Sequence, residues 1–275
     1  MFFLILAVIC SVLIGNLLVV FKNDPASDIK YIFLGNYIVA SLFSLALALP
    51  HGLYIGGFDI WFGVLTGLFF LSNLVIYQRN IAVNGLSLSV GVMRVAVILP
   101  TLMSFIYFAE RLGMVNLIGI VVIFAAFSVL TEIRLLHNLL WLIGLFLISG
   151  LTESTLKIYS ELGNSNQQPF LMMIFASAGV FTLFWIMIGK NILNWKSLLY
   201  GFALGVPNQL SSLFFLKGLK TIPATVAYPI YASGVVLVSI ISDLLIWRKF
   251  FTIKQRIALG LLVSGVILVS LNFSK

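Results

Sequence analysis

The sequence predicts an all-α integral membrane protein with ten transmembrane helices arranged as two inverted five-helix repeats. Hydrophobic residues make up 61% of the 275 residues, charged residues make up 9%, and the mean hydropathy is +1.16. Apolar stretches of about 20 residues, the length that one helix needs to cross a bilayer, follow one another with short polar gaps. The second half of the chain also repeats features of the first half. A water-soluble domain does not have this composition.

The apolar stretches are continuous, whereas the strands of a membrane barrel would alternate apolar and polar residues. Each stretch must therefore close its own backbone hydrogen bonds as a helix. The first stretch has no basic n-region and no small-residue cleavage site, so we expect it to remain in the mature protein. We predict helices over residues 1–21, 31–49, 57–79, 84–108, 114–131, 138–159, 169–189, 196–218, 221–247 and 254–272.

A repeat at an offset of 138 residues relates the two halves. Gly63 and Gly67 in the third predicted helix match Gly201 and Gly205 in the eighth. We predict one repeat over 1–135 and the other over 136–275. Further matches pair Arg79 with Lys217, Gly85 with Pro223, Ser87 with Thr225 and, after one inserted residue, Glu110 with Lys249.

An odd number of helices in each half means that the second half enters the membrane in the opposite sense to the first. Inverted repeats are typical of carriers, in which two similar packings of the halves open one central site to either side. Channels can have the same symmetry, and the repeat can also be a remnant of gene duplication without a mechanistic role.

Local motifs resemble those of the drug/metabolite transporter superfamily, EamA-like type, over nearly the whole chain. This resemblance implies ten helices in two repeats and a role in export. The chain departs from the family pattern at Ile14, where a tryptophan is usual, and at Lys249, where an acidic residue is expected. The motifs are Gly15-Asn16 followed by Lys22, Pro100-x9-Glu110-Arg111-x7-Gly119, Gly201-x3-Gly205 and Ala224-Thr-Val-Ala-Tyr-Pro229.

The first helix contains no Asp or Glu. The proton-coupling carboxylate that small multidrug-resistance relatives carry in this helix is therefore absent. The only cysteine, Cys10, allows neither a disulfide nor a thiolate metal site within the chain. We expect no cofactor and no metal.

Arg94 lies near the middle of the fourth predicted helix. A cation at that depth costs several kcal/mol unless it faces the interior of the bundle and finds a partner. Its planar guanidinium is suited to bind a carboxylate or phosphate of a substrate. The alternative is a structural arginine bonded to the carbonyls of a neighbouring helix.

Glu153 and Lys157 stand four residues apart on the sixth predicted helix, with the acid first, and this spacing predicts an ion pair on one face. Several hydroxyl side chains surround them, so the helix either lines a wet space or neutralises its own charges. The eighth helix carries Asn208, Gln209 and Ser212 after Pro207, which frees a backbone carbonyl and predicts a kink.

The predicted substrate site lies in a cavity between the repeats. The two Gly-x3-Gly pairs, Gly63 with Gly67 and Gly201 with Gly205, are assigned to helix packing. Single polar residues in membrane helices often serve only as contacts between helices. The candidates for substrate binding are Arg94, Asn16, Asn73, Tyr77, Glu153, Lys157, Asn208, Gln209, Ser212, Tyr228 and Tyr231.

We interpret the chain as a secondary transporter that exports a small polar metabolite, such as an amino acid, by alternating access. The alternatives are an exporter of cationic compounds, a flippase for lipid-linked sugars and a non-transporting membrane subunit. An enzyme is not expected, because His51 and His137 lie in predicted loops and no two acids share a helix face.

The net charge is +8, but the basic residues are scattered over loops. We therefore expect lipid headgroups and a small-molecule substrate as partners rather than nucleic acid. We expect a multi-pass protein of a bacterial-type inner or cell membrane and leave open whether it forms a homodimer. Loop charges place both termini outside, whereas the family resemblance implies termini in the cytoplasm.

Overall fold

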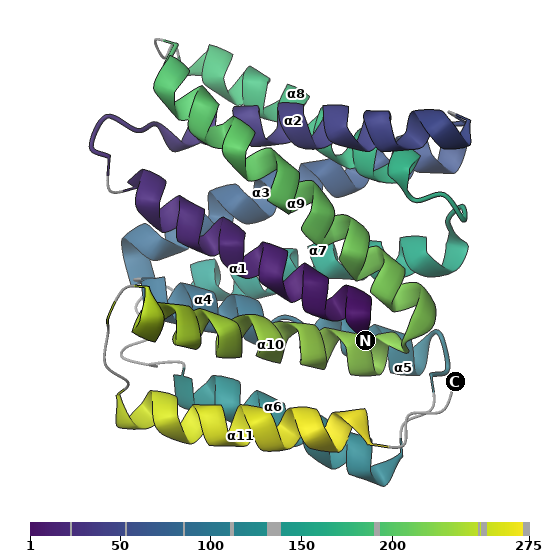
Figure 1. Cartoon of the computed structure of the whole chain (residues 1–275), viewed down its shortest axis with the longest axis vertical. Helices are drawn as coiled ribbons and strands as arrows, with labels where there is room; N and C mark the ends of the chain where they lie inside the picture. Colours follow the sequence, from purple (N-terminus) through teal and green to yellow (C-terminus); the bar gives the residue numbers. More distant parts are fainter. Residues whose placement is uncertain are drawn as a thin grey trace. The chain divides into compact units, whose positions relative to one another are not determined.

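The computed structural model describes residues 1–22, 24–52, 54–84, 86–110, 113–130, 139–189, 193–246, 248 and 252–271 (Figure 1). Within these ranges the chain is all-helical, without a strand, as the sequence predicts. Gly85, Arg111, His137 and Lys249 lie outside the described residues. The helices are α1 Phe2–Lys22, α2 Ile29–Ala48, η1 Leu49–His51, α3 Gly57–Asn84, α4 Leu86–Val95, α5 Ile98–Ile106, α6 Met114–Leu130, α7 Leu139–Leu162, α8 Gln168–Ile188, α9 Trp195–Thr221, α10 Ala224–Leu245 and α11 Ile253–Ser270.

Six of the described helices are long and apolar enough to cross a bilayer. They include residues 2–21 of α1, 57–81 of α3 and 224–242 of α10, together with α2, α7 and α8. Residues 92–106 and 114–129 form shorter apolar helical segments. The chain is therefore a multi-pass membrane protein, and the count of ten transmembrane helices stays a prediction.

The predicted helix over 84–108 is wrong as a single element, because α4 ends at Val95 and α5 begins at Ile98. Pro100 explains the interruption. A proline has no backbone N–H, and its ring clashes with the carbonyl four residues earlier, here that of Ala96. This carbonyl instead accepts a tighter bond from the amide of Leu99, at 3.0 Å.

The chain folds into two compact units. Unit 1 comprises Met1–Ile5, Ser72–Ile158 and Gly218–Lys275, and unit 2 comprises Leu6–Leu71 and Tyr159–Lys217. Each unit takes helices from both halves of the sequence. The division at residues 135 and 136 therefore describes the predicted sequence repeat, which stays a prediction, and does not separate the compact units.

In unit 2, α2 and α8 run side by side (Figure 1), and glycines bring a third and fourth helix against them. A Cβ atom on Gly63 of α3 would lie 2.6 Å from the Cβ of Met173 on α8. A Cβ on Gly201 of α9 would lie 2.8 Å from the Cα of Gly35 on α2. Only glycine permits such close approach of two helices.

These contacts follow the offset of the sequence repeat. Gly201 lies 138 positions after Gly63. In the same way, Met173, which Gly63 meets, lies 138 positions after Gly35, which Gly201 meets. The third helix of each half thus packs on the second helix of the other half. This exchange is what two copies of one packing motif would produce.

In unit 1, α6 and α11 lie side by side (Figure 1). Gly119 of α6 faces the backbone of Val269, and Gly265 of α11 faces Ile123. The amide of Asn116 donates to the carbonyls of Val269 at 2.9 Å and Leu271 at 2.6 Å. This side chain satisfies carbonyls at the end of α11 that have no partner within the helix.

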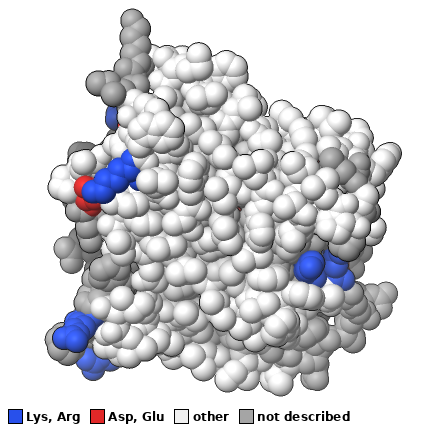
Figure 2. Space-filling view, turned by 45° about the horizontal axis from the view of Figure 1, so that its top comes forward, with Lys and Arg blue, Asp and Glu red and all other residues white. Residues whose placement is uncertain are grey.

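The face shown in Figure 2 is mostly uncharged, and its Lys and Arg side chains lie near the margins. Large apolar side chains are exposed on the helices, among them Leu140, Ile188 and Val121. A monomeric soluble protein rarely exposes so much apolar surface, whereas a lipid-facing surface is expected to do so.

Candidate functional site

Arg94 lies in the last turn of α4 and is half-buried. This position places its cation near the carbonyl end of α4, where the helix dipole stabilises positive charge. The charge of Arg94 interacts with the carboxyl group of Glu153 and with Tyr77 on α3. Arg94 is therefore within electrostatic reach of two other predicted candidates, Glu153 on α7 and Tyr77 on α3.

The break between α4 and α5 explains how Arg94 and Glu153 become neighbours. A Cβ on Gly150 of α7 would lie 2.9 Å from the carbonyl oxygen of Ala96, in that break. Glu153 follows Gly150 by about one turn of α7, and Arg94 precedes Ala96 by two residues. Close packing at this glycine brings the end of α4, which carries Arg94, against the part of α7 that carries Glu153.

The carboxyl oxygen Oε2 of Glu153 is buried and has no hydrogen-bond partner among the described residues. A buried carboxyl group that lacks a partner is costly and rare in native structures. Glu153 is therefore the strongest indication of a ligand in unit 1.

The predicted ion pair between Glu153 and Lys157 is wrong. The ammonium group of Lys157 lies 2.6 Å from Oε1 of Glu110, and the Lys157 side chain is only 1% exposed. The spacing of four residues allows a pair on one helix face. Lys157 instead pairs with a side chain that is far away in the sequence and that offers further hydrogen bonds.

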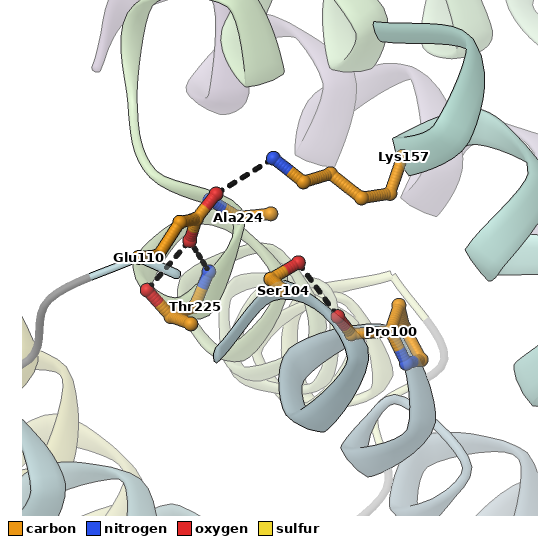
Figure 3. Close-up of polar contacts among 6 residues, drawn as sticks. All are labelled: Pro100, Ser104, Glu110, Lys157, Ala224 and Thr225. Atoms are coloured by element: carbon orange, nitrogen blue, oxygen red, sulfur yellow. Dashed lines mark hydrogen bonds and ion pairs between the residues drawn. The ribbon is translucent and has the colours of Figure 1, made fainter. Parts of the chain in front are cut away.

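Glu110 lies between α5 and α6 and joins α7 to the start of α10 (Figure 3). Besides Lys157, its carboxylate accepts hydrogen bonds from the backbone amides of Ala224 at 2.9 Å and Thr225 at 2.8 Å. The hydroxyl of Thr225 donates a further bond, also at 2.8 Å. A carboxylate at a helix N-terminus satisfies amides that otherwise lack partners and stabilises the helix dipole.

Burial alone would raise the pKa of Glu110. The hydrogen bonds from Lys157, Thr225 and Ala224, together with the charge of Lys157, outweigh this effect and lower the pKa below its ordinary value. Glu110 is therefore ionised near neutral pH. Its preceding residue, Ala109, has a φ of 50°, a conformation that costs a non-glycine residue energy and that the surrounding contacts must impose.

Two further tyrosines of unit 1 belong to the same region. The hydroxyl of Tyr228 on α10 donates to the backbone carbonyl of Glu153 at 2.6 Å, and Tyr231 interacts electrostatically with Tyr228. Asn73 on α3 accepts a hydrogen bond from Ser149 on α7 at 2.7 Å. The bond of Tyr228 joins α10 to α7, and the bond of Ser149 joins α7 to α3.

The other four candidates lie in unit 2. Asn208 on α9 donates to Asn36 on α2 at 3.1 Å, and Gln209 donates to Gln168 on α8 at 3.0 Å. Asn16 donates to a carbonyl of its own helix, and Ser212 is half-buried on α9. The two amide pairs have the character of contacts between helices.

A polar cluster around Asp59 escaped the sequence analysis. This carboxylate is fully buried and accepts hydrogen bonds from the hydroxyl of Tyr159 at 2.6 Å, the amide of Asn164 at 2.8 Å and the backbone amide of Gly56 at 2.9 Å. The feature that could have indicated this cluster is an acidic residue in the first turn of α3, where the helix dipole favours negative charge.

Comparisons with known proteins agree with this architecture. The EamA-like transporter family matches residues 137–271. An uncharacterized protein of Haemophilus influenzae is 26% identical over 266 residues, which cover 90% of this chain and 89% of that protein. A solved crystal structure of a protein has a TM-score of 0.76 at 14% identity and covers 98% of this chain and 96% of that chain. At this identity the likeness concerns the fold alone.

Proposed function

Because the chain belongs to the EamA-like transporter family, and is thus a membrane transporter of the drug/metabolite type, we propose that it exports a small zwitterionic metabolite. The substrate class is an amino acid or a molecule of similar charge, carried across a bacterial-type inner membrane by alternating access. The chain acts as a secondary carrier, without cofactor or metal.

The observation that supports this proposal is the buried oxygen Oε2 of Glu153, which has no hydrogen-bond partner among the described residues and lies within electrostatic reach of Arg94. A guanidinium binds a carboxylate through two parallel hydrogen bonds. The unpartnered oxygen of Glu153 is an acceptor for an ammonium group. A zwitterion placed between them would satisfy both groups and add no net charge to a region where unpaired charge is expensive.

The same pair disfavours a simple organic cation as substrate. A cation that approaches Glu153 also approaches the guanidinium of Arg94, and like charges repel strongly in a medium of low dielectric constant. The hydroxyl groups of Tyr77 and Tyr231 lie on helices of the same unit and offer further hydrogen bonds to a polar substrate.

Alternating access is supported by the packing of unit 2, in which the third helix of each half packs on the second helix of the other. A pair of related packings gives two arrangements of similar energy, as carriers with inverted repeats require. We propose that the two halves form such a repeat and that the ten predicted helices all cross the membrane.

The test is counterflow in liposomes that contain the purified protein. Zwitterionic amino acids should exchange, whereas their decarboxylated amines and N-acetyl derivatives, which each lack one charge, should exchange far more slowly. Replacing one partner of a charge-assisted bond should weaken apparent affinity by roughly 10- to 100-fold. We expect this loss in Arg94→Gln and in Glu153→Gln.

Asp24→Asn is the matched control, because Asp24 pairs with Lys196, whose side chain is 62% exposed, in unit 2. An exposed ion pair contributes little, so this variant should transport normally. Normal exchange of the zwitterion by Arg94→Gln would refute the proposal. Preference for cationic dyes or lipid-linked sugars, or the lack of any flux, would instead favour a cation exporter, a flippase or a non-transporting subunit.

A further inference from the structure

Glu110 connects two helices that carry the proposed substrate site. Its carboxylate holds the ammonium of Lys157 on α7 and the first turn of α10 at the same time, with four bonds between 2.6 and 2.9 Å (Figure 3). The Glu110 side chain is 13% exposed and lies beyond the end of α5. It is thus separate from the membrane-spanning residues that are proposed to touch the substrate.

A second link between α7 and α10 lies one helical turn away. Tyr228, three residues after Thr225 on α10, donates its hydroxyl to the carbonyl of Glu153. One turn of α7, from Glu153 to Lys157, is therefore fastened to the first two turns of α10 at both ends.

The links at Glu110 and Tyr228 both oppose a sliding movement of α10 along α7. The side chains that project from this turn of α7 include Glu153, and the second turn of α10 carries Tyr228 and Tyr231. If α10 slid along α7, the hydroxyl of Tyr228 would leave the carbonyl of Glu153, and the surroundings of the Glu153 carboxyl group would change. Four convergent bonds at Glu110 oppose such a shift, because each depends on direction as well as distance.

We propose that Glu110 is a positioning residue that fixes the register of α7 and α10 and thereby sets the affinity of the site at Glu153 for its substrate. It does this without contact with the substrate. The inference rests on the proposed function, since it concerns the same site. Glu110 then contributes to substrate affinity as well as to stability.

The experiment measures the apparent KM and the maximal rate of counterflow. Glu110→Gln keeps the size of the side chain but removes the ion pair and some acceptor capacity. We expect KM to rise about tenfold, the effect of losing roughly one good hydrogen bond, while the maximal rate changes less. A residue with a purely structural role would lower the amount of active protein and leave KM unchanged.

Charge reversal separates this arrangement from an ordinary ion pair. In the double variant Glu110→Lys with Lys157→Glu, the opposite charges are restored. The new lysine, however, would face the backbone amides of Ala224 and Thr225, which only donate and form the positive end of the helix dipole. We therefore expect no recovery of KM, whereas recovery would overturn the proposal.

Thr225 supplies a milder pair of variants in case Glu110 variants fail to fold. Thr225→Val removes only the hydroxyl bond to Glu110, and Thr225→Ser retains it. We expect KM to rise severalfold in Thr225→Val and to stay normal in Thr225→Ser. Amide hydrogen exchange in the first turn of α10 should accelerate in Thr225→Val alone, which reports on the link independently of transport.

The outcomes distinguish the two proposals. If Arg94→Gln weakens affinity as expected while Thr225→Val and Glu110→Gln retain a normal KM, the proposed function stands and the positioning role is wrong. If Arg94→Gln transports normally, the proposed function is wrong, and the positioning role, which rests on it, falls as well. Accelerated exchange in α10 would then show only a structural link.

Discussion

Gly201 is where the structure makes the sharpest prediction about stability. A Cβ atom in Gly201→Ala would meet the carbonyl oxygen of Ile32 and would lie 2.8 Å from both the Cα of Gly35 and the amide nitrogen of Asn36. Non-bonded atoms of these kinds prefer separations of about 3.5 Å. All three neighbours are backbone atoms, so no side chain can turn aside, and α2 and α9 must move apart.

The required movement exceeds about 0.5 Å, and a gap of that size loses about a quarter or more of the dispersion energy between the surfaces. Overpacking of this kind costs about 3 kcal/mol, the upper part of the usual range. For a chain of this size, that corresponds to a melting temperature lowered by roughly 6–12 °C. The assay is the fraction of monodisperse protein that survives a series of temperatures in detergent.

Gly260→Ala is the matched control, because a Cβ atom on this exposed residue of α11 has no neighbour within 4 Å. Its melting temperature should stay within a few degrees of the parent protein, since helix propensity changes by about 1 kcal/mol at most. If Gly201→Ala is as stable as Gly260→Ala, the close contact between α2 and α9 does not exist. The conclusion that the third helix of each half packs on the second helix of the other half would then be wrong.

Two other predictions concern unit 1. Asn116→Asp should destabilise the protein more than Asn116→Ala in the same thermal assay. A carboxylate would face carbonyl oxygens at the end of α11, whereas alanine only removes the bonds. Equal losses of stability would contradict the hydrogen bonds that Asn116 donates to these carbonyls. The pKa of Glu110 is lowered in the folded protein, so the stability it provides is complete above its unfolded value of 4.5 and is lost as pH falls through the lower folded value. Acid titration of the melting temperature should show this loss in the parent protein and a smaller one in Glu110→Gln, and identical profiles would contradict the role of Glu110.

The sequence predicts those features that depend on local composition and spacing. Long apolar stretches identify membrane helices because every backbone group in lipid must be satisfied within its own segment. Spacing alone assigns the glycines at 63, 67, 201 and 205 to packing, and a Cβ atom on each of them would meet a neighbouring helix. In such cases a pattern that spans only a few residues is enough to predict the feature.

The sequence does not predict the partner of a side chain when that partner is distant along the chain. Lys157 has an acid four residues before it, but its ammonium lies on Glu110, 47 residues away. Spacing on one helix shows only which side chains can meet, whereas the choice of partner depends on helix packing. The break before Pro100 is missed because apolar composition continues through it, although proline itself carries the signal.

The two halves share a packing scheme but differ in their polar chemistry. The glycine contacts of α3 and α9 are related by one offset, yet the position equivalent to Arg94 is Ala232 or Ser233, depending on where the inserted residue falls. The position that matches Asn73 is Ser211.

Helix packing requires small residues wherever backbones approach, and a symmetric pair of packings preserves that requirement in both halves. The proposed zwitterionic substrate has no internal symmetry, so it would require only one guanidinium and one carboxylate. We therefore expect Ser233→Ala, the change at the alternative position, to leave substrate affinity unchanged, whereas Arg94→Gln should lower it by roughly 10- to 100-fold.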